Sequence, residues 1–215
     1  SVSGLHVGIV YVVIAFLLAF MDKSAKTKVL KTVLVVLFLW AYAFITGLSP
    51  SVERASLMFS LVAIGTALNR RSQIYNTVFM SAFLMLILNP DFLYDVGFQL
   101  SYAAVLSIVF FQQPFSQLLP VSHKALRWLR DLFAVSVAAQ LGTLPFTLYY
   151  FHQFPNYFLL TNVVAIPLST LVIYLAIVLL VVAFIPYVAA AVAFLLKWSL
   201  WLLNFLSVGI EHLPY

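Results

Sequence analysis

The sequence is a succession of long apolar runs, each ended by a short polar segment, and this pattern leaves few possible folds. Hydrophobic residues make up 65% of the 215 residues and charged residues only 8%. A soluble domain contains about a quarter charged residues, so it could not hide this much apolar surface from water. The runs approach the roughly 20 residues that a helix needs to cross a bilayer. The sequence therefore predicts an integral membrane protein.

Polar and turn-forming residues divide the chain into eight apolar runs. We expect helices over about residues 6–21, 29–47, 50–68, 74–88, 92–111, 132–150, 161–184 and 187–208. Ser49 and Pro50 mark the start of the third, because serine is a good N-cap and proline suits the first helical position. Residues 115–128 mix apolar and polar side chains and are predicted to lie at the membrane surface. The predicted fold is an all-α polytopic transmembrane helix bundle of about eight spans, some of them broken by Pro145 and Pro167.

The basic residues indicate how these helices cross the membrane. Nine of the 11 Lys and Arg residues lie around residues 23–31, 69–71 and 124–130. The segments that alternate with these, near residues 49–50, 90–91 and 152–153, contain none. Because basic residues favour the cytoplasmic side, eight spans then put both ends on the non-cytoplasmic side. The net charge of +5 therefore indicates topology and is not evidence of nucleic-acid binding.

Residues 1–215 are predicted to form a single transmembrane domain with no room for a second, soluble one. The chain starts at Ser1 and has no recognisable signal peptide, so we expect a fragment of a longer protein whose flanking domains are absent. It contains no cysteine, which excludes disulfides, thiolate metal sites and cysteine nucleophiles within it.

Several polar residues are predicted at membrane depth, where they are costly and are functional candidates by default. Asp95, Gln99 and Tyr102 lie at i, i+4 and i+7 of the fifth helix and share a face. A structural hydrogen-bond cluster and a pore lining explain this stripe about equally well. Candidate channel-lining or structural polar residues are His6, Glu53, Arg54, Asp95, Gln99, Ser101, Tyr102, Gln140, Thr143 and Asn162.

The two charged residues of the third helix have simpler explanations as well. Glu53 lies in the first turn, where a carboxylate complements the helix dipole. Arg54 can extend toward the interface or pair with a neighbouring helix. Ser56 and Ser60 continue the face of Glu53, and such small residues favour close helix packing.

Soluble-enzyme chemistry finds little support in the sequence. His6, His123, His152 and His212 are scattered and show no paired spacing for a metal ion. No glycine-rich phosphate loop and no Gly-x-Ser-x-Gly motif occurs. We expect no catalytic residue, no metal site and no cofactor in this chain.

Six segments, taken in order, resemble the competence domain of ComEC-type DNA-uptake proteins. They are residues 3–8, 49–55, 89–90, 95–101, 140–145 and 162–167. The resemblance implies a bacterial inner-membrane channel that passes single-stranded DNA into the cytoplasm during natural transformation. It also implies flanking OB-like and metallo-β-lactamase-like domains, an outer DNA receptor and a cytoplasmic helicase-like ATPase as partners, besides the lipid bilayer.

A channel for a polyanion favours basic residues, neutral donors and aromatic platforms. The residues that suit that role are Tyr102, Gln99, Gln140 and Thr143, and Arg54 could steer phosphates. The carboxylates of Glu53 and Asp95 would instead repel phosphate. We therefore expect Glu53 and Asp95 to be structural, each paired with a donor away from the DNA.

Two other functions stay open. A secondary transporter of a smaller anion would use Glu53, Arg54 and Asp95 as coupling groups. A membrane anchor for outer nuclease domains would keep its polar stripes dry and fully hydrogen-bonded.

Overall fold

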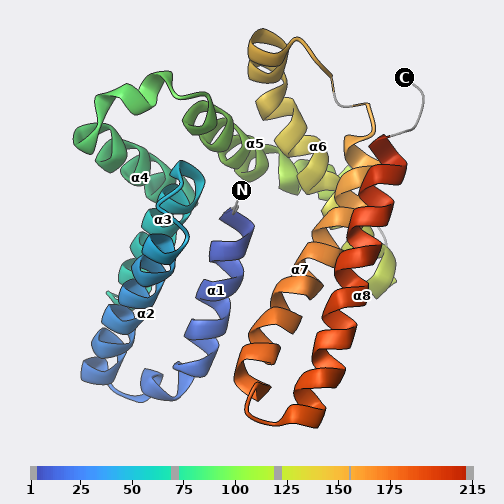
Figure 1. The fold of residues 1–215 in the computed structure, drawn as a ribbon. Helices are drawn as coiled ribbons and strands as arrows, with labels where there is room; N and C mark the ends of the chain where they lie inside the picture. Colours follow the sequence, from blue (N-terminus) through green and yellow to red (C-terminus); the bar gives the residue numbers. More distant parts are fainter. Residues whose placement is uncertain (1–3, 69–72, 119–122, 155, 212–215) are drawn as a thin grey trace. The chain divides into compact units, whose positions relative to one another are not determined.

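The computed structural model describes residues 4–68, 73–118, 123–154 and 156–211, and every regular element in these ranges is a helix (Figure 1). In chain order the elements are α1 (Gly4–Leu17), the 3-10 helix η1 (Ala19–Lys23), α2 (Ala25–Ile45), α3 (Pro50–Ala67), α4 (Ile74–Leu88), the 3-10 helix η2 (Pro90–Tyr94), α5 (Val96–Leu118), α6 (Lys124–Phe151), α7 (Phe158–Val182) and α8 (Pro186–Glu211). The predicted all-α fold is confirmed. The predictions that involve Ser3, Asn69, Arg70, Arg71, Ser122 and His212 lie outside the described residues.

The helices form two compact units. The first unit lies within residues 1–110 and 139–152 and contains α1 to α4, most of α5 and the C-terminal half of α6. The second lies within residues 111–138 and 153–215 and contains the remaining parts of α5 and α6 together with α7 and α8. That residues 1–215 form one domain stays a prediction.

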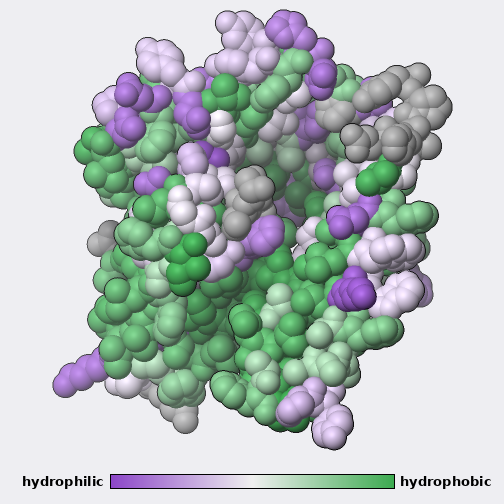
Figure 2. Space-filling model, in the orientation of Figure 1, coloured by the Kyte–Doolittle hydropathy of each residue, from purple (hydrophilic) through white to green (hydrophobic). Residues whose placement is uncertain are grey.

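The surface of the helices is apolar, which is the reverse of a water-soluble protein. Figure 2 shows that hydrophobic side chains cover most of the visible surface. Large apolar side chains such as Ile45 and Phe184 are 84% and 91% exposed. Within the described residues, five helices are long and apolar enough to cross a membrane, namely α2, α5, α6, α7 and α8. This surface is the one that lipid requires, and the chain is a membrane protein.

The other three helices differ from these five in length or composition. α1 and α4 have 14 and 15 residues, which at 1.5 Å per residue extend only about 21–23 Å against a hydrocarbon core of about 30 Å. α3 has 18 residues and includes Glu53 and Arg54. The eight α-helices agree with the predicted number of helices, while eight full spans remain a prediction.

The start of the fifth helix was predicted wrongly. The run predicted from residue 92 is divided by Asp95, with η2 before it and α5 after it. Asp95 causes the division, because its backbone is extended, with φ −72° and ψ 121°, and its Oδ1 accepts the Phe98 backbone N–H at 2.6 Å and starts a new helix. Asp95 therefore precedes α5 and does not lie on its polar stripe.

The position of residues 115–128 at the membrane surface stays a prediction, and the structure adds only which helices contain them. α5 continues through Pro114 to Leu118, and α6 begins at Lys124, so most of these residues belong to two helix ends. The fifth helix was predicted to end at residue 111, but it continues through the two glutamines before Pro114, because glutamine is a good helix former.

The lysines of the first basic cluster lie on a helix and not in a loop. α2 begins at Ala25, so Lys26, Lys28 and Lys31 occupy its first turns. The Thr27 hydroxyl accepts the Ser24 backbone N–H at 3.2 Å and donates to the Ser24 carbonyl at 2.9 Å. This local pairing starts the helix four residues earlier than the apolar pattern indicates.

Small residues allow α1 to pack closely on α3. Gly4 and Gly8 lie one turn apart on α1, and a Cβ on Gly8 would stand 3.1 Å from the ring of Phe59. Tyr11 stacks on the same ring with 5.0 Å between centroids. The buried core beneath these contacts comes from α1, α2 and α3 and consists of Val7, Val35, Leu39, Ala43, Val52, Ala55 and Ala63.

The turn between α2 and α3 positions the first residues of α3. Gly47 has a φ of 82°, a conformation that glycine adopts without steric cost. The Leu48 backbone N–H then donates to the Ala43 carbonyl at 2.9 Å and closes the end of α2. The predicted start at Ser49 and Pro50 is confirmed, although the Ser49 side chain makes no capping hydrogen bond.

Candidate functional site

Arg54 is a buried cation in the second turn of α3. Its exposed fraction is 4%, and its Nη1 lies 3.9 Å from Oδ1 of Asp95. That distance allows attraction but is too long for a hydrogen bond. Its Nε and Nη1 are buried without a hydrogen-bond acceptor among the described residues. The guanidinium is therefore held by charge and packing more than by hydrogen bonds.

Asp95 is the N-cap of α5. Its Oδ1 accepts the Phe98 backbone N–H at 2.6 Å, and its carbonyl accepts the Gln99 backbone N–H at 3.0 Å. An ionised carboxylate here satisfies a free N–H group and complements the helix dipole. Its side chain is 40% exposed, so the ion pair joins the buried guanidinium of Arg54 to a partly exposed carboxylate.

Tyr102 is buried between α4 and α5. Its hydroxyl lies 3.0 Å from Oγ of Ser81, which itself donates to the Val78 carbonyl at 2.8 Å. Either hydroxyl can be the donor in this pair. The Tyr102 hydroxyl is also 3.7 Å from the sulfur of Met85. These partners were not predicted, since the sequence does not indicate which residues of α4 pack against α5.

Replacing Tyr102 with phenylalanine is expected to lower the free energy of unfolding by about 1 kcal/mol, the usual net value of one hydrogen bond. Ser81 keeps its bond to Val78, so no buried donor is orphaned. Thermal unfolding of the purified protein measures the effect. Tyr94→Phe is the matched control, because Tyr94 is 79% exposed. Equal losses in the two variants would contradict a structural role for the Tyr102 hydroxyl.

Gln99 connects the start of α5 to the end of α6. Its Nε2 donates to the Leu93 carbonyl at 2.8 Å, and its Oε1 accepts the Tyr150 hydroxyl at 2.9 Å. Both the nitrogen and the oxygen of the Gln99 amide thus make hydrogen bonds within the first unit.

The polar residues of α6 are satisfied only in part. The Thr143 hydroxyl lies 3.0 Å from the Ala139 carbonyl and 3.3 Å from the Gln140 carbonyl, close to the break in backbone bonding at Pro145. Nε2 of Gln140 is buried without a hydrogen-bond partner among the described residues.

A cavity of about 490 Å³ opens beside Arg54. Its lining comes from α1, α3, α4 and α5 and includes Gly4, Ser51, Arg54, Thr77 and Ser101. The structure therefore groups Arg54, Asp95 and Tyr102 around one part of the first unit, with Ser101 on the wall of the cavity.

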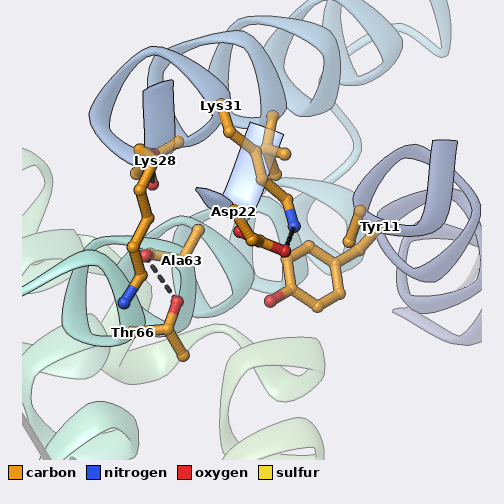
Figure 3. Close-up of a pocket in the computed structure, with 9 residues that line it drawn as sticks. Tyr11, Asp22, Lys28, Lys31, Ala63 and Thr66 are labelled. Atoms are coloured by element: carbon orange, nitrogen blue, oxygen red, sulfur yellow. Dashed lines mark hydrogen bonds and ion pairs between the residues drawn. The ribbon is translucent and has the colours of Figure 1, made fainter. Parts of the chain in front are cut away.

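A second cavity, of about 410 Å³, lies between α1, α2 and α3, and its lining includes Lys28 and Lys31 of the first basic cluster (Figure 3). Lys31 and Asp22 point toward one another there, with 2.7 Å between Nζ and Oδ2. The Thr66 hydroxyl donates to the Ala63 carbonyl at 2.7 Å. Lys31 is thus neutralised by an acidic neighbour, as Arg54 is.

The remaining candidates lie outside the Arg54–Tyr102 cluster. His6 is half-buried on α1, and Glu53 is half-buried in the first turn of α3. Asn162 is half-buried on α7, in the second unit. Lys197 was not among the predicted site residues. It lines a hollow on α8 with three aromatic residues, and the helical spacing of these four residues was the signal that could have found it.

Comparison with known proteins identifies the family of this chain. A family model described as "Competence protein" matches residues 1–215. The chain belongs to the competence protein family. It is 35% identical over 173 residues to "ComE operon protein 3" of Bacillus subtilis (strain 168), covering 80% of this chain and 20% of that relative. The chain thus spans about a fifth of the relative's length, and no solved structure matches it.

Proposed function

We propose that this competence-family chain forms part of a channel that passes single-stranded DNA across the bacterial inner membrane during natural transformation. The observation that carries the proposal is the family match over residues 1–215, the same residues that fold into the apolar helices. The proposed orientation places both ends on the non-cytoplasmic side, where flanking OB-like and metallo-β-lactamase-like domains and an outer DNA receptor would act. A helicase-like ATPase would act in the cytoplasm.

In this proposal the polar cluster of the first unit holds helices in place. Asp95 caps α5, Tyr102 bonds to α4, and Gln99 bonds to α6. Arg54 has Asp95 as a counter-ion, which reduces its attraction for phosphate. Contacts with DNA would then come from side chains elsewhere on the bundle.

The experiment replaces this segment of the full-length protein with unrelated transmembrane helices and keeps the flanking domains on the same side of the membrane. Cells carrying the exchange are expected to accumulate no nuclease-resistant labelled DNA in the cytoplasm, although DNA still binds at the surface. Normal accumulation would refute the channel and favour the anchor for outer nuclease domains.

The anchor receives support from one observation, because Gln99 and Tyr102 are fully hydrogen-bonded within the protein, as an anchor predicts. Gln140 and Arg54, in contrast, keep buried N–H groups without hydrogen-bond partners among the described residues. The hydrogen bonds of Gln99 and Tyr102 thus fit an anchor, whereas the unsatisfied N–H groups of Gln140 and Arg54 favour a bundle that leaves some polar groups for water or a ligand.

A further inference from the structure

One face of α8 combines a lysine with a row of aromatic rings. Phe194, Trp198, Trp201 and Phe205 lie at i, i+4, i+7 and i+11, which places them along one side of the helix. Successive ring centroids are 6.2, 5.4 and 5.3 Å apart. Lys197 lies beside them and shares a hollow of about 390 Å³ with Phe194, Trp198 and Trp201.

The four aromatic rings are exposed, whereas the opposite side of α8 is partly buried. The four aromatic side chains are between 53% and 61% exposed. Leu196, Ser199 and Leu203 are half-buried and lie on the other side of α8. Since α7 and α8 pack side by side in the second unit (Figure 1), the aromatic face points away from α7.

Lys197 is an unusual residue at this depth. It lies 11 positions after Pro186, or about 16 Å along a helix of about 39 Å, so its Cα falls inside a hydrocarbon core of about 30 Å. A charge at this depth is costly and normally faces a polar or water-filled space.

Nothing nearby on the α7–α8 hairpin balances that charge. α7 contains no charged residue, and the acidic residue of α8, Glu211, is about 21 Å away along the helix. Lys197 has no hydrogen-bond or ion-pair partner among the residues that the structure describes. It differs in this respect from Arg54 and Lys31, which both have carboxylate neighbours.

A lipid-facing role explains this face poorly. Membrane-facing tryptophans concentrate at the two interfaces, where the indole N–H can meet water. Trp198 and Trp201 lie near the middle of α8. Two indole donors and an ammonium group at this depth would all lack acceptors in hydrocarbon.

We infer that the Lys197 face of α8 binds single-stranded DNA, with bases stacking on Trp198 and Trp201 and a phosphate contacting the lysine. Sequence-independent binding of single strands combines these two contacts, aromatic platforms for bases and cations for the backbone. The inference rests on the proposed function and names the surface that meets the substrate. It places that surface on α8, whereas the sequence suggested Tyr102 and Gln99.

The test uses the full-length protein in competent cells, with a photoreactive phenylalanine analogue at position 201 and labelled donor DNA. A cross-link to single-stranded DNA is expected from position 201, and none from position 174 of α7. Tyr174 is an exposed aromatic residue of the same unit, so it is the matched control. Lys197→Gln and the pair Trp198→Leu and Trp201→Leu should each lower DNA accumulation about 10-fold or more, while Tyr174→Leu leaves it unchanged. Membrane levels of all variants are measured alongside.

A cross-link from position 201 to phospholipid in place of DNA would overturn the assignment, as would normal uptake in both sets of variants. Either result leaves the channel proposal standing, provided that the segment exchange abolishes DNA entry. Continued DNA entry after the segment exchange would overturn both.

Discussion

Replacing Asp95 with alanine is expected to lower the free energy of unfolding by about 3 kcal/mol. Arg54 is 4% exposed and would keep its charge with no carboxylate 3.9 Å away. Removing one partner of a buried ion pair costs about 3–5 kcal/mol, and losing an N-cap about 1 kcal/mol. The expected loss of stability stays near the lower end of the range for a buried ion pair, because the Asp95 side chain is 40% exposed and water already screens its charge. Unfolding of the purified protein in mixed micelles measures the change.

Two further variants separate the contributions of Asp95. Asp95→Asn keeps a good capping side chain but removes the charge, so its loss of stability should be about 1 kcal/mol smaller than that of Asp95→Ala. Adding Arg54→Met to Asp95→Ala should restore part of the stability, because an uncharged pair leaves no buried charge behind. Asp91→Ala is the control, since Asp91 is an exposed carboxylate in η2. A loss in Asp95→Ala no larger than in this control would show that the pair does not stabilise the fold.

Replacing Gly142 with alanine is expected to push α5 and α6 apart. A Cβ at this position would overlap Cβ of Ser107 and stand 2.5 Å from the backbone carbonyl oxygen of Ala103. A backbone atom cannot rotate away, so the helices must separate. Overpacking costs up to about 3 kcal/mol, and the better helix propensity of alanine returns about 1 kcal/mol. The expected net loss is about 2 kcal/mol in the same unfolding measurement.

Gly209→Ala is the matched control for this substitution. Gly209 also lies in a long helix, but a Cβ there would meet no atom within 4 Å. This variant should be unchanged or more stable by up to about 1 kcal/mol. Adding Ser107→Gly to Gly142→Ala should restore part of the loss and leave the contact with Ala103. Equal stability of the two alanine variants would contradict close packing at Gly142.

The sequence predicted those features that depend on neighbouring residues alone. α4 was predicted at residues 74–88 and is observed at Ile74–Leu88, because polar residues end the apolar run on both sides. Pro50 begins α3 as expected from its restricted φ. The lipid-facing character followed from composition, since too few charged residues exist to cover the surface. Family membership was predicted from ordered motifs and is confirmed.

The neighbours of the polar residues could not be predicted from the sequence. Asp95, Gln99 and Tyr102 share a helical spacing, yet they have three different neighbours: Arg54 of α3, Tyr150 of α6 and Ser81 of α4. Spacing predicts which side of one helix a residue occupies and contains no information on what packs there. The start of the fifth helix was predicted wrongly for a related reason, since Asp95 divides the apolar run and accepts the Phe98 backbone N–H.

The sequence by itself thus determined that the chain is helical, that it lies in a membrane and which family it belongs to. Those properties depend on composition and short-range pattern, which are independent of how helices meet. Only the tertiary structure decided that Arg54 and Lys31 have carboxylate neighbours, while Lys197 lies on an open aromatic face without one among the described residues. Whether a charge is neutralised depends on residues far away in sequence, brought within a few ångströms by packing.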